Sequence, residues 1–268
     1  MWSVRSPGKS SPFGPSGHTD VVTDDPHSFV LSATSDDPTA SDALEETQPP
    51  AALRELLAEV EAAFAELGGP ERRWPDPHVT ADGGLRAPLD EEYSRTLEPG
   101  KYAILWVRAD AWRRALVGRG WAEAAEVDGP DVESWLGEHV VAPASTTVLR
   151  PHRAGAVPLR LARTVTDTEL CGLLVGVGEP AVGVRRLPEC GCDACDDGSA
   201  ALLESLDEVV LAVVEGALEV SWDGRGHRLR MPESASWGGE DPGFSRPFRV
   251  AAGPWAGEWT PRPLIALD

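Results

Sequence analysis

The segment SAALLESLDEVVLAVVEG, residues 199–216, decides the fold class of this chain. Its apolar residues recur at the spacing of one helix face, and acidic residues occupy the positions between them. Gly216 follows directly, and glycine is the preferred residue just after a helix. The pattern predicts an amphipathic helix over about 199–215. Its buried stripe is expected to comprise Leu202, Leu203, Leu206, Val209, Val210, Val213 and Val214, with Glu204, Asp207, Glu208 and Glu215 facing solvent.

Strand patterns flank this helix on both sides. Residues 145–187 are rich in Val, Leu and Thr and carry turn signals, which predicts three or four strands, mostly joined as hairpins. We expect Pro158 to confine its strand to a sheet edge, because proline cannot donate to the ladder. After the helix, ALEVSWDGRGHRLRMP (217–232) predicts a hairpin that turns at 223–226. The remainder, 247–268, predicts an irregular covering segment with a last strand.

Helical patterns dominate the preceding part of the chain. Residues 51–67 carry apolar side chains at helical spacing and are followed by Gly68 and Gly69. Residues 104–124 predict a second helix broken near Gly118 and Gly120, and 131–140 a third, short one. Helices, strands, a helix and strands therefore follow one another. This order favours an α+β fold, in which a mostly antiparallel sheet packs against the N-terminal helices and the 199–215 helix.

The N-terminal residues and one internal segment lack such patterns. Residues 1–49 are rich in Ser, Thr, Pro and Asp without any period, so we interpret them as a disordered tail or an over-extended start of the reading frame. Residues 50–268 are predicted to form a single α+β domain. Within it, 72–102 reads as a long irregular segment, which is more often functional than accidental. We expect it to form a cleft or partner surface together with the Trp-rich C-terminus.

The charge excludes several classes of partner. The chain has 44 acidic and 24 basic residues, a net charge of −20. A strongly acidic surface repels phosphate backbones and anionic lipids, so we expect neither nucleic acid nor a membrane as partner. No apolar run approaches the ~20 residues of a membrane span, and residues 1–20 lack the apolar core of a secretory signal. We therefore expect a cytoplasmic protein, whose thiols stay reduced.

Three of the four cysteines lie in one loop, ECGCDACDDGSA, residues 189–200. Cys190, Cys192 and Cys195 put three thiolates on a short arc, and short cysteine spacings are how loops supply zinc ligands. A tetrahedral site needs a fourth ligand. The candidates are Cys171, His78 and His152, or a carboxylate from Asp193 or Asp196.

Two other readings of this loop stay open. A C-x-x-C beside a helix start is typical of thiol–disulfide chemistry, with Cys192 or Cys195 as the redox thiol, because a helix N-terminus lowers a thiol pKa. The neighbouring Asp193, Asp196 and Asp197 would raise that pKa instead. Alternatively, the cysteines fill the loop and have no chemical role.

Other motifs point to no reaction. GVGEPAVGV (176–184) does not match a dinucleotide fingerprint, and phosphate-loop, zinc-protease and nucleophile-elbow motifs are absent from the sequence. The cluster Asp90, Glu91 and Glu92 is either an acid–base group or a solvated face. Trp74, Trp255 and Trp259 are either core residues or pocket linings. No catalytic residue and no organic cofactor are predicted.

Six phrases together resemble an uncharacterised family of actinobacterial proteins known only as a domain of unknown function. They are WPDPH (74–78), EYSR (92–95), PGKY (99–102), ADAW (109–112), ARTV (162–165) and CGCDACDDGS (190–199). The resemblance covers about residues 50–260. It implies one continuous domain with this loop as a family feature, and it implies no activity.

The hypothesis favoured by these patterns is a non-catalytic binding or interaction protein with an unknown protein or small-molecule partner, in which the loop holds a structural zinc. The alternative is an enzyme, either a thiol-dependent redox enzyme or a metal-dependent one, that uses the same C-x-C-x-x-C loop.

Overall fold

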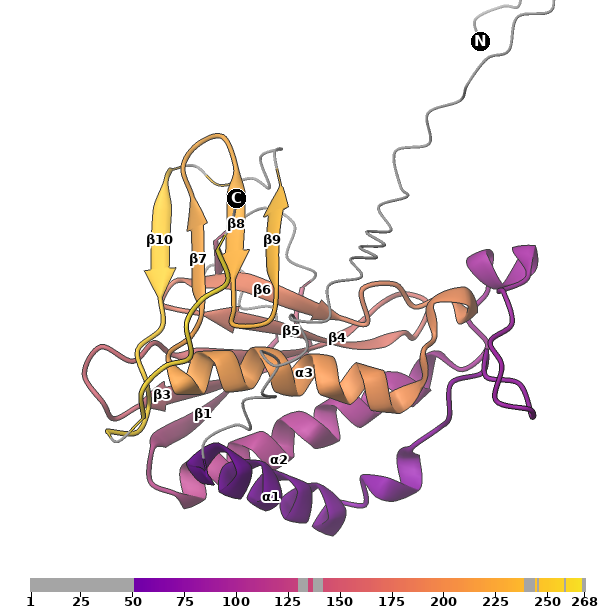
Figure 1. The fold of residues 1–268 in the computed structure, drawn as a ribbon, viewed down its shortest axis with the longest axis horizontal. Helices are drawn as coiled ribbons and strands as arrows, with labels where there is room; N and C mark the ends of the chain where they lie inside the picture. Colours follow the sequence, from indigo (N-terminus) through magenta and orange to yellow (C-terminus); the bar gives the residue numbers. More distant parts are fainter. Residues whose placement is uncertain are drawn as a thin grey trace, which may run out of the picture. The chain divides into compact units, whose positions relative to one another are not determined.

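A computed structural model describes residues 51–129, 135–136, 142–238, 244, 246–257 and 259–266 (Figure 1). The predicted tail, residues 1–49, lies outside this part of the chain. The described residues form an α+β fold, as predicted. Its helices are α1 (Ala51–Glu66), α2 (Ile104–Gly118) and α3 (Gly198–Glu215), with short 3₁₀ helices η1 (Pro70–Arg72), η2 (Asp90–Ser94), η3 (Pro99–Ala103) and η5 (Asp193–Cys195).

The strands form two sheets. The larger sheet has the order β1-β3-β4-β5-β6-β2 and the smaller one the order β10-β7-β8-β9. Neighbouring strands are antiparallel except for β2, which runs parallel to β6. The strands are β1 (Ala122–Asp128), β2 (Trp135–Leu136), β3 (Ser145–Pro151), β4 (Leu159–Val165), β5 (Cys171–Val177), β6 (Ala181–Leu187), β7 (Glu219–Trp222), β8 (His227–Arg230), β9 (Ala235–Gly238) and β10 (Phe248–Ala251).

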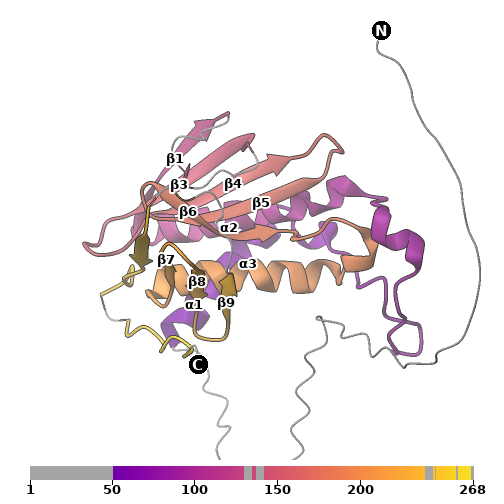
Figure 2. The same cartoon turned by 90° about the horizontal axis from the view of Figure 1, so that it is seen from above.

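The main core lies between the larger sheet and the helices. In Figure 2, α2 and α3 lie against one face of the sheet, with α1 packed against α2. The predicted 199–215 helix is confirmed as α3, and Leu206, Val209 and Val213 are fully buried. Each Å² of apolar surface that this stripe buries contributes about 25 cal/mol to stability, and this burial holds the helix against the sheet. The start of α3 thereby places the cysteine loop at one end of the core.

Two of the acidic positions on α3 do not face solvent as predicted. The Glu215 side chain is only 2% exposed and accepts hydrogen bonds from Arg262. The carboxylate of Asp207 faces the buried guanidinium of Arg108. Both partners are remote in sequence, so helix periodicity alone could not show that these acids lie in ion pairs.

Three expectations about individual elements were wrong. Helix α2 ends at Gly118, where the break was predicted, but residues 122–128 form β1 instead of continuing the helix. Gly120 has a φ of +68°, a left-handed conformation that ends the helix. Pro158 precedes a central strand, β4, and its lack of an N–H costs no ladder bond there because the ladder begins at Leu159. Within 131–140, the described residues Trp135–Leu136 form a strand.

Within the described ranges, no helix combines the length and the apolar content that a membrane crossing requires.

Candidate metal centre

The cysteine loop connects β6 to α3 and brings its three thiols together. The Sγ atoms of Cys190, Cys192 and Cys195 all lie within 4.8 Å of one another. Those of Cys190 and Cys192 are 3.1 Å apart. Cys190 and Cys195 are exposed and Cys192 is half-buried, so the cluster is open to solvent. The spacing that predicted a common site therefore does produce one in space.

The carboxylate of Asp193 is held by the irregular segment 72–102. Arg95 Nε donates to Asp193 Oδ2 at 2.7 Å, and the backbone N–H of Leu97 donates to Oδ1 at 3.1 Å. Burial opposes the charge, but these hydrogen bonds still hold the pKa of Asp193 below its ordinary value. Thr96 adds a hydrogen bond from its hydroxyl to the Gly191 carbonyl at 2.8 Å. The loop is thus fastened at its middle by residues 95–97.

Asp196 anchors the other end of the loop and is 4% exposed. Its carboxylate accepts hydrogen bonds from Trp74 Nε1 at 2.9 Å and from the Gly198 N–H at 3.0 Å. It also forms an ion pair with Lys101, whose ammonium lies 5.3 Å from the ring centres of both Trp74 and Tyr102. The negative charges of Asp193 and Asp196 are therefore balanced by cations of the 72–102 segment.

The segment around Trp74 is clamped to the start of α3. The Ser199 N–H donates to the Trp74 carbonyl at 3.1 Å, and the Trp74 N–H donates to Ser199 Oγ at 3.0 Å. Gly198 has a φ of +81°, and a Cβ there would lie 2.6 Å from the backbone N of Asp76. Only glycine permits this approach. Figures 1 and 2 both show the segment after α1 beside the loop before α3.

This arrangement corrects the expected cleft between 72–102 and the C-terminal tryptophans. Trp255 and Trp259 are 2% and 8% exposed and belong to the main core. The backbone N–H of Trp255 donates to the carbonyl of Val214, at the end of α3 opposite the loop. The 72–102 segment braces the cysteine loop without the help of the C-terminal tryptophans.

The candidates for the fourth ligand lie apart from the three thiols. Among the described residues, no further His, Cys, Asp or Glu joins the three-cysteine group. Cys171 begins β5, and its Sγ contacts the carbonyl of Glu169 at 3.8 Å. His152 is exposed after β3, and His78 is buried beside Asp76. A fourth ligand from this set stays a prediction.

Cys190 and Cys195 differ in acidity. The backbone N–H of Cys192, and then its thiol, hold the pKa of Cys190 below the ordinary cysteine value. The hydrogen bond with Cys192, together with burial, raises the pKa of Cys195 to about 12. The neighbouring acids were expected to raise the pKa of the redox thiol, and at Cys195 the pKa is raised, although by Cys192 and by burial. Cys190 therefore loses its proton before Cys195.

We expect iodoacetamide to label Cys190 before Cys195 in metal-free, reduced protein. The thiolate is the nucleophile, so the labelling rate at a given pH follows the fraction deprotonated. Peptide mass mapping over a time course at mildly alkaline pH measures the order. The Cys190→Ser variant should lose the fast phase and keep the slow ones. Labelling of Cys195 before Cys190 would contradict this order.

The acidic cluster at 90–92 divides into a buried, paired carboxylate, Glu92, and two exposed ones. Glu92 is 6% exposed and accepts two hydrogen bonds from Arg86, each 2.8 Å long. The Arg86 hydrogen bonds and one from the Leu89 N–H lower the pKa of Glu92 to about 2. It stays ionised at neutral pH and cannot act as a proton donor there. Asp90 and Glu91 are exposed.

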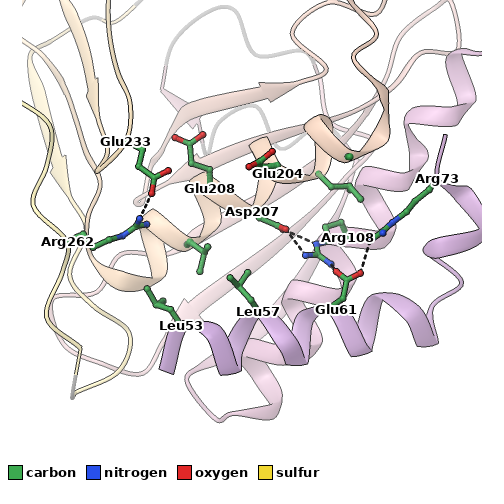
Figure 3. Close-up of a pocket in the computed structure, with 13 residues that line it drawn as sticks. Leu53, Leu57, Glu61, Arg73, Arg108, Glu204, Asp207, Glu208, Glu233 and Arg262 are labelled. Atoms are coloured by element: carbon green, nitrogen blue, oxygen red, sulfur yellow. Dashed lines mark hydrogen bonds and ion pairs between the residues drawn. The ribbon is translucent and has the colours of Figure 1, made fainter. Parts of the chain in front are cut away.

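A pocket of about 490 Å³ lies between α1 and α3 and is a second candidate site (Figure 3). Its charged groups are largely paired with one another. At its base, Arg108 bonds to Asp207 through both Nε and Nη2, at 2.9 and 2.6 Å, and to Glu61 at 2.6 Å. We assign this ion-pair network a structural role. The lining also includes Leu53, Leu57, Arg73, Ala200, Leu203, Glu204, Glu208, Leu211, Glu233 and Arg262.

Comparison with known proteins yields one match. A family model described as "Family of unknown function (DUF6226)" matches residues 60–258. This range includes the cysteine loop and the 72–102 segment that holds it, which we call the brace. No curated protein and no solved structure matches the chain.

Proposed function

The chain belongs to the family of unknown function DUF6226, and from the geometry of its cysteine loop we propose that it is a metal-binding protein that holds zinc on Cys190, Cys192 and Cys195. One observation carries this proposal. Three sulfur atoms converge, while the neighbouring carboxylates of Asp193 and Asp196 are bound to Arg95 and Lys101. The loop thereby offers a soft, sulfur-only donor set, which favours zinc over magnesium or calcium.

The sulfur positions suit a tetrahedral ion with small adjustments. Zinc–sulfur bonds of about 2.3 Å place two thiolates of a tetrahedron about 3.8 Å apart. The separations here run from 3.1 Å to at most 4.8 Å, so the required movements are within the reach of side-chain rotation. The bound zinc would also remove the mutual repulsion of the thiolates.

The fourth position distinguishes this site from a closed structural one. Structural zinc sites have four protein ligands, whereas sites with three keep a place for water or another molecule. Because Cys190 and Cys195 are exposed, we propose that the fourth position opens to solvent and takes water or a donor atom from a partner. The brace already fixes the loop through Asp193 and Asp196, so zinc is not its only support.

The setting we propose is a cytoplasmic protein of an actinobacterium, with its thiols reduced and available for metal. Its net charge of −20 favours a protein or small-molecule partner over nucleic acid or a membrane. We infer a role in binding over one in catalysis.

Zinc content and thiol protection test the proposal together. We expect the Cys190→Ser/Cys192→Ser/Cys195→Ser variant to bind one zinc ion fewer per chain than the parent, because it lacks the thiolates. In the parent, zinc should slow alkylation of the three loop cysteines until a chelator is added. Elemental analysis of untagged, reduced protein and mass mapping measure the two effects.

Cys171→Ser is the matched control, since it removes the cysteine that lies outside the thiol group. It should retain the zinc content of the parent. Equal zinc in the parent and the triple variant, or loop thiols that react as fast with zinc as without it, contradicts the proposal.

A second candidate is thiol–disulfide exchange, favoured by the lowered pKa of Cys190 and its 3.1 Å approach to Cys192. The Cys190 thiolate would attack a partner's disulfide and release one partner thiolate. Cys192 would then displace the second, leaving an oxidised loop and a reduced partner. A Cys190–Cys192 disulfide that forms in a glutathione buffer, together with zinc-independent thiol reactivity, is the result expected from this alternative.

A further inference from the structure

His78 is a buried polar side chain that the thiol centre does not use. Its side chain is 7% exposed, and its Nδ1 lies 3.3 Å from Asp76 Oδ1. Its Nε2 is buried and has no hydrogen-bond partner among the described residues. Leaving such an atom unpaired costs about 1–3 kcal/mol, and a ligand bound at Nε2 would remove that cost.

Two carboxylates lie beside this imidazole. One nitrogen of His78 and one oxygen each from Asp76 and Asp197 all lie within 4.8 Å of one another. Asp76 comes from the segment after η1, and Asp197 occupies the N-cap position of α3, where its side chain makes no capping hydrogen bond. Asp197 is exposed, which leaves the group accessible from solvent. Residues far apart in sequence thus supply a nitrogen and two oxygens to one point.

The surrounding contacts hold this group together. The close approach at Gly198 fixes Asp76 against the start of α3, as do the reciprocal bonds between Trp74 and Ser199. The backbone N–H of His78 donates to Asp76 Oδ1 at 2.7 Å, which fixes the turn on which the imidazole lies. The nearby Arg86 gives two of its nitrogens to Glu92, and its charge also acts on Asp76 from a greater distance.

We propose that Asp76, His78 and Asp197 form a second metal site that binds a divalent first-row cation, with zinc as the preferred ion. One imidazole nitrogen and two carboxylate oxygens are zinc ligands of the kind found in three-ligand sites. A divalent cation balances the two carboxylates and relieves their repulsion. This site uses nitrogen and oxygen donors, and the thiol site uses sulfur, so the two sites are chemically distinct and separately removable.

The test removes each site independently and counts zinc. We expect two zinc ions per chain in the parent, one in Asp197→Asn, one in the triple serine variant of the loop, and none in the combination. The Asp197 side chain is exposed and makes no capping hydrogen bond, so Asp197→Asn should fold and melt like the parent. Within the triple serine background, Asp197→Asn should weaken zinc affinity at least about tenfold.

Asp90→Asn is the matched control, an exposed acid of the same segment outside the group. It should change neither the zinc count nor the affinity. The pattern of losses separates this inference from the proposed function. One zinc in the parent and none in the triple serine variant overturns the second site alone. One zinc that survives the triple substitution and disappears in Asp197→Asn overturns the thiol site alone.

Discussion

Replacing Arg108 by methionine is expected to lower the free energy of unfolding by about 3–5 kcal/mol, the usual result of removing one partner of a buried ion pair. The Arg108 side chain is 5% exposed and bonds to Asp207 and Glu61. Asp207 also accepts a hydrogen bond from Trp112 Nε1 at 2.7 Å, so the carboxylate cannot turn away easily. Without Arg108 it stays charged with no cation beside it. Urea unfolding measures the loss as a lower midpoint.

Two further variants make this prediction specific. Asp207→Asn in the Arg108→Met background should recover part of the stability, because the amide oxygen still accepts the Trp112 bond but carries no charge. Arg114→Met serves as the control, since Arg114 and Glu66 form an exposed pair 3.7 Å apart. It should change the stability by less than about 1 kcal/mol. A loss of similar size in both arginine variants contradicts the assignment of Arg108 to the core network.

Replacing Asp196 by alanine is expected to cost about 2–4 kcal/mol and to release the cysteine loop. Its carboxylate accepts bonds from Trp74, Gly198 and Lys101, and hydrogen bonds to charged groups contribute about 1.5–3 kcal/mol each at sites of this kind. The alanine variant leaves these donors without an acceptor. Thermal melting measures the loss, and limited proteolysis should show new cleavage within 189–197.

The same variant tests how the brace supports the metal centre. A released loop must be ordered again by zinc, so zinc affinity in a chelator competition should fall together with stability. Glu189→Gln is the control, because Glu189 is 74% exposed and pairs only at the surface with Arg185. Its melting temperature and zinc affinity should match those of the parent. Unchanged zinc affinity in Asp196→Ala would show that the thiols organise without the brace.

Local sequence patterns correctly predicted elements in which apolar residues recur at a regular spacing or a turn sequence is present. The 199–215 stripe predicted α3, and the hairpin around 223–226 was found as β7 and β8. The same reasoning failed where a partner from elsewhere decides the outcome. Residues Ala122–Asp128 form a strand because β3 lies alongside them, and Pro158 is tolerated because the ladder begins one residue later.

The candidate sites divide in the same way. The C-x-C-x-x-C spacing was enough to propose that three thiols share a point, because such short spacings are typical of metal-binding loops, and the folded loop brings them within 4.8 Å of one another. The functional reading of Asp193 and Asp196 could not be predicted, since their partners Arg95 and Lys101 lie about a hundred positions away. His78 was a candidate ligand from its residue type, but its companions Asp76 and Asp197 became visible only in three dimensions.

The sequence by itself therefore determined the α+β class, the amphipathic α3 and the cluster of loop thiols, because each rests on interactions between neighbours in the chain. Only the tertiary structure decided which acids lie in ion pairs and which lie around an imidazole. Asp193 and Asp196 are held by Arg95 and Lys101, whereas Asp76 and Asp197 lie close to His78. That difference depends on which distant segments meet, and here it is set by the contact of residues 74–97 with the start of α3.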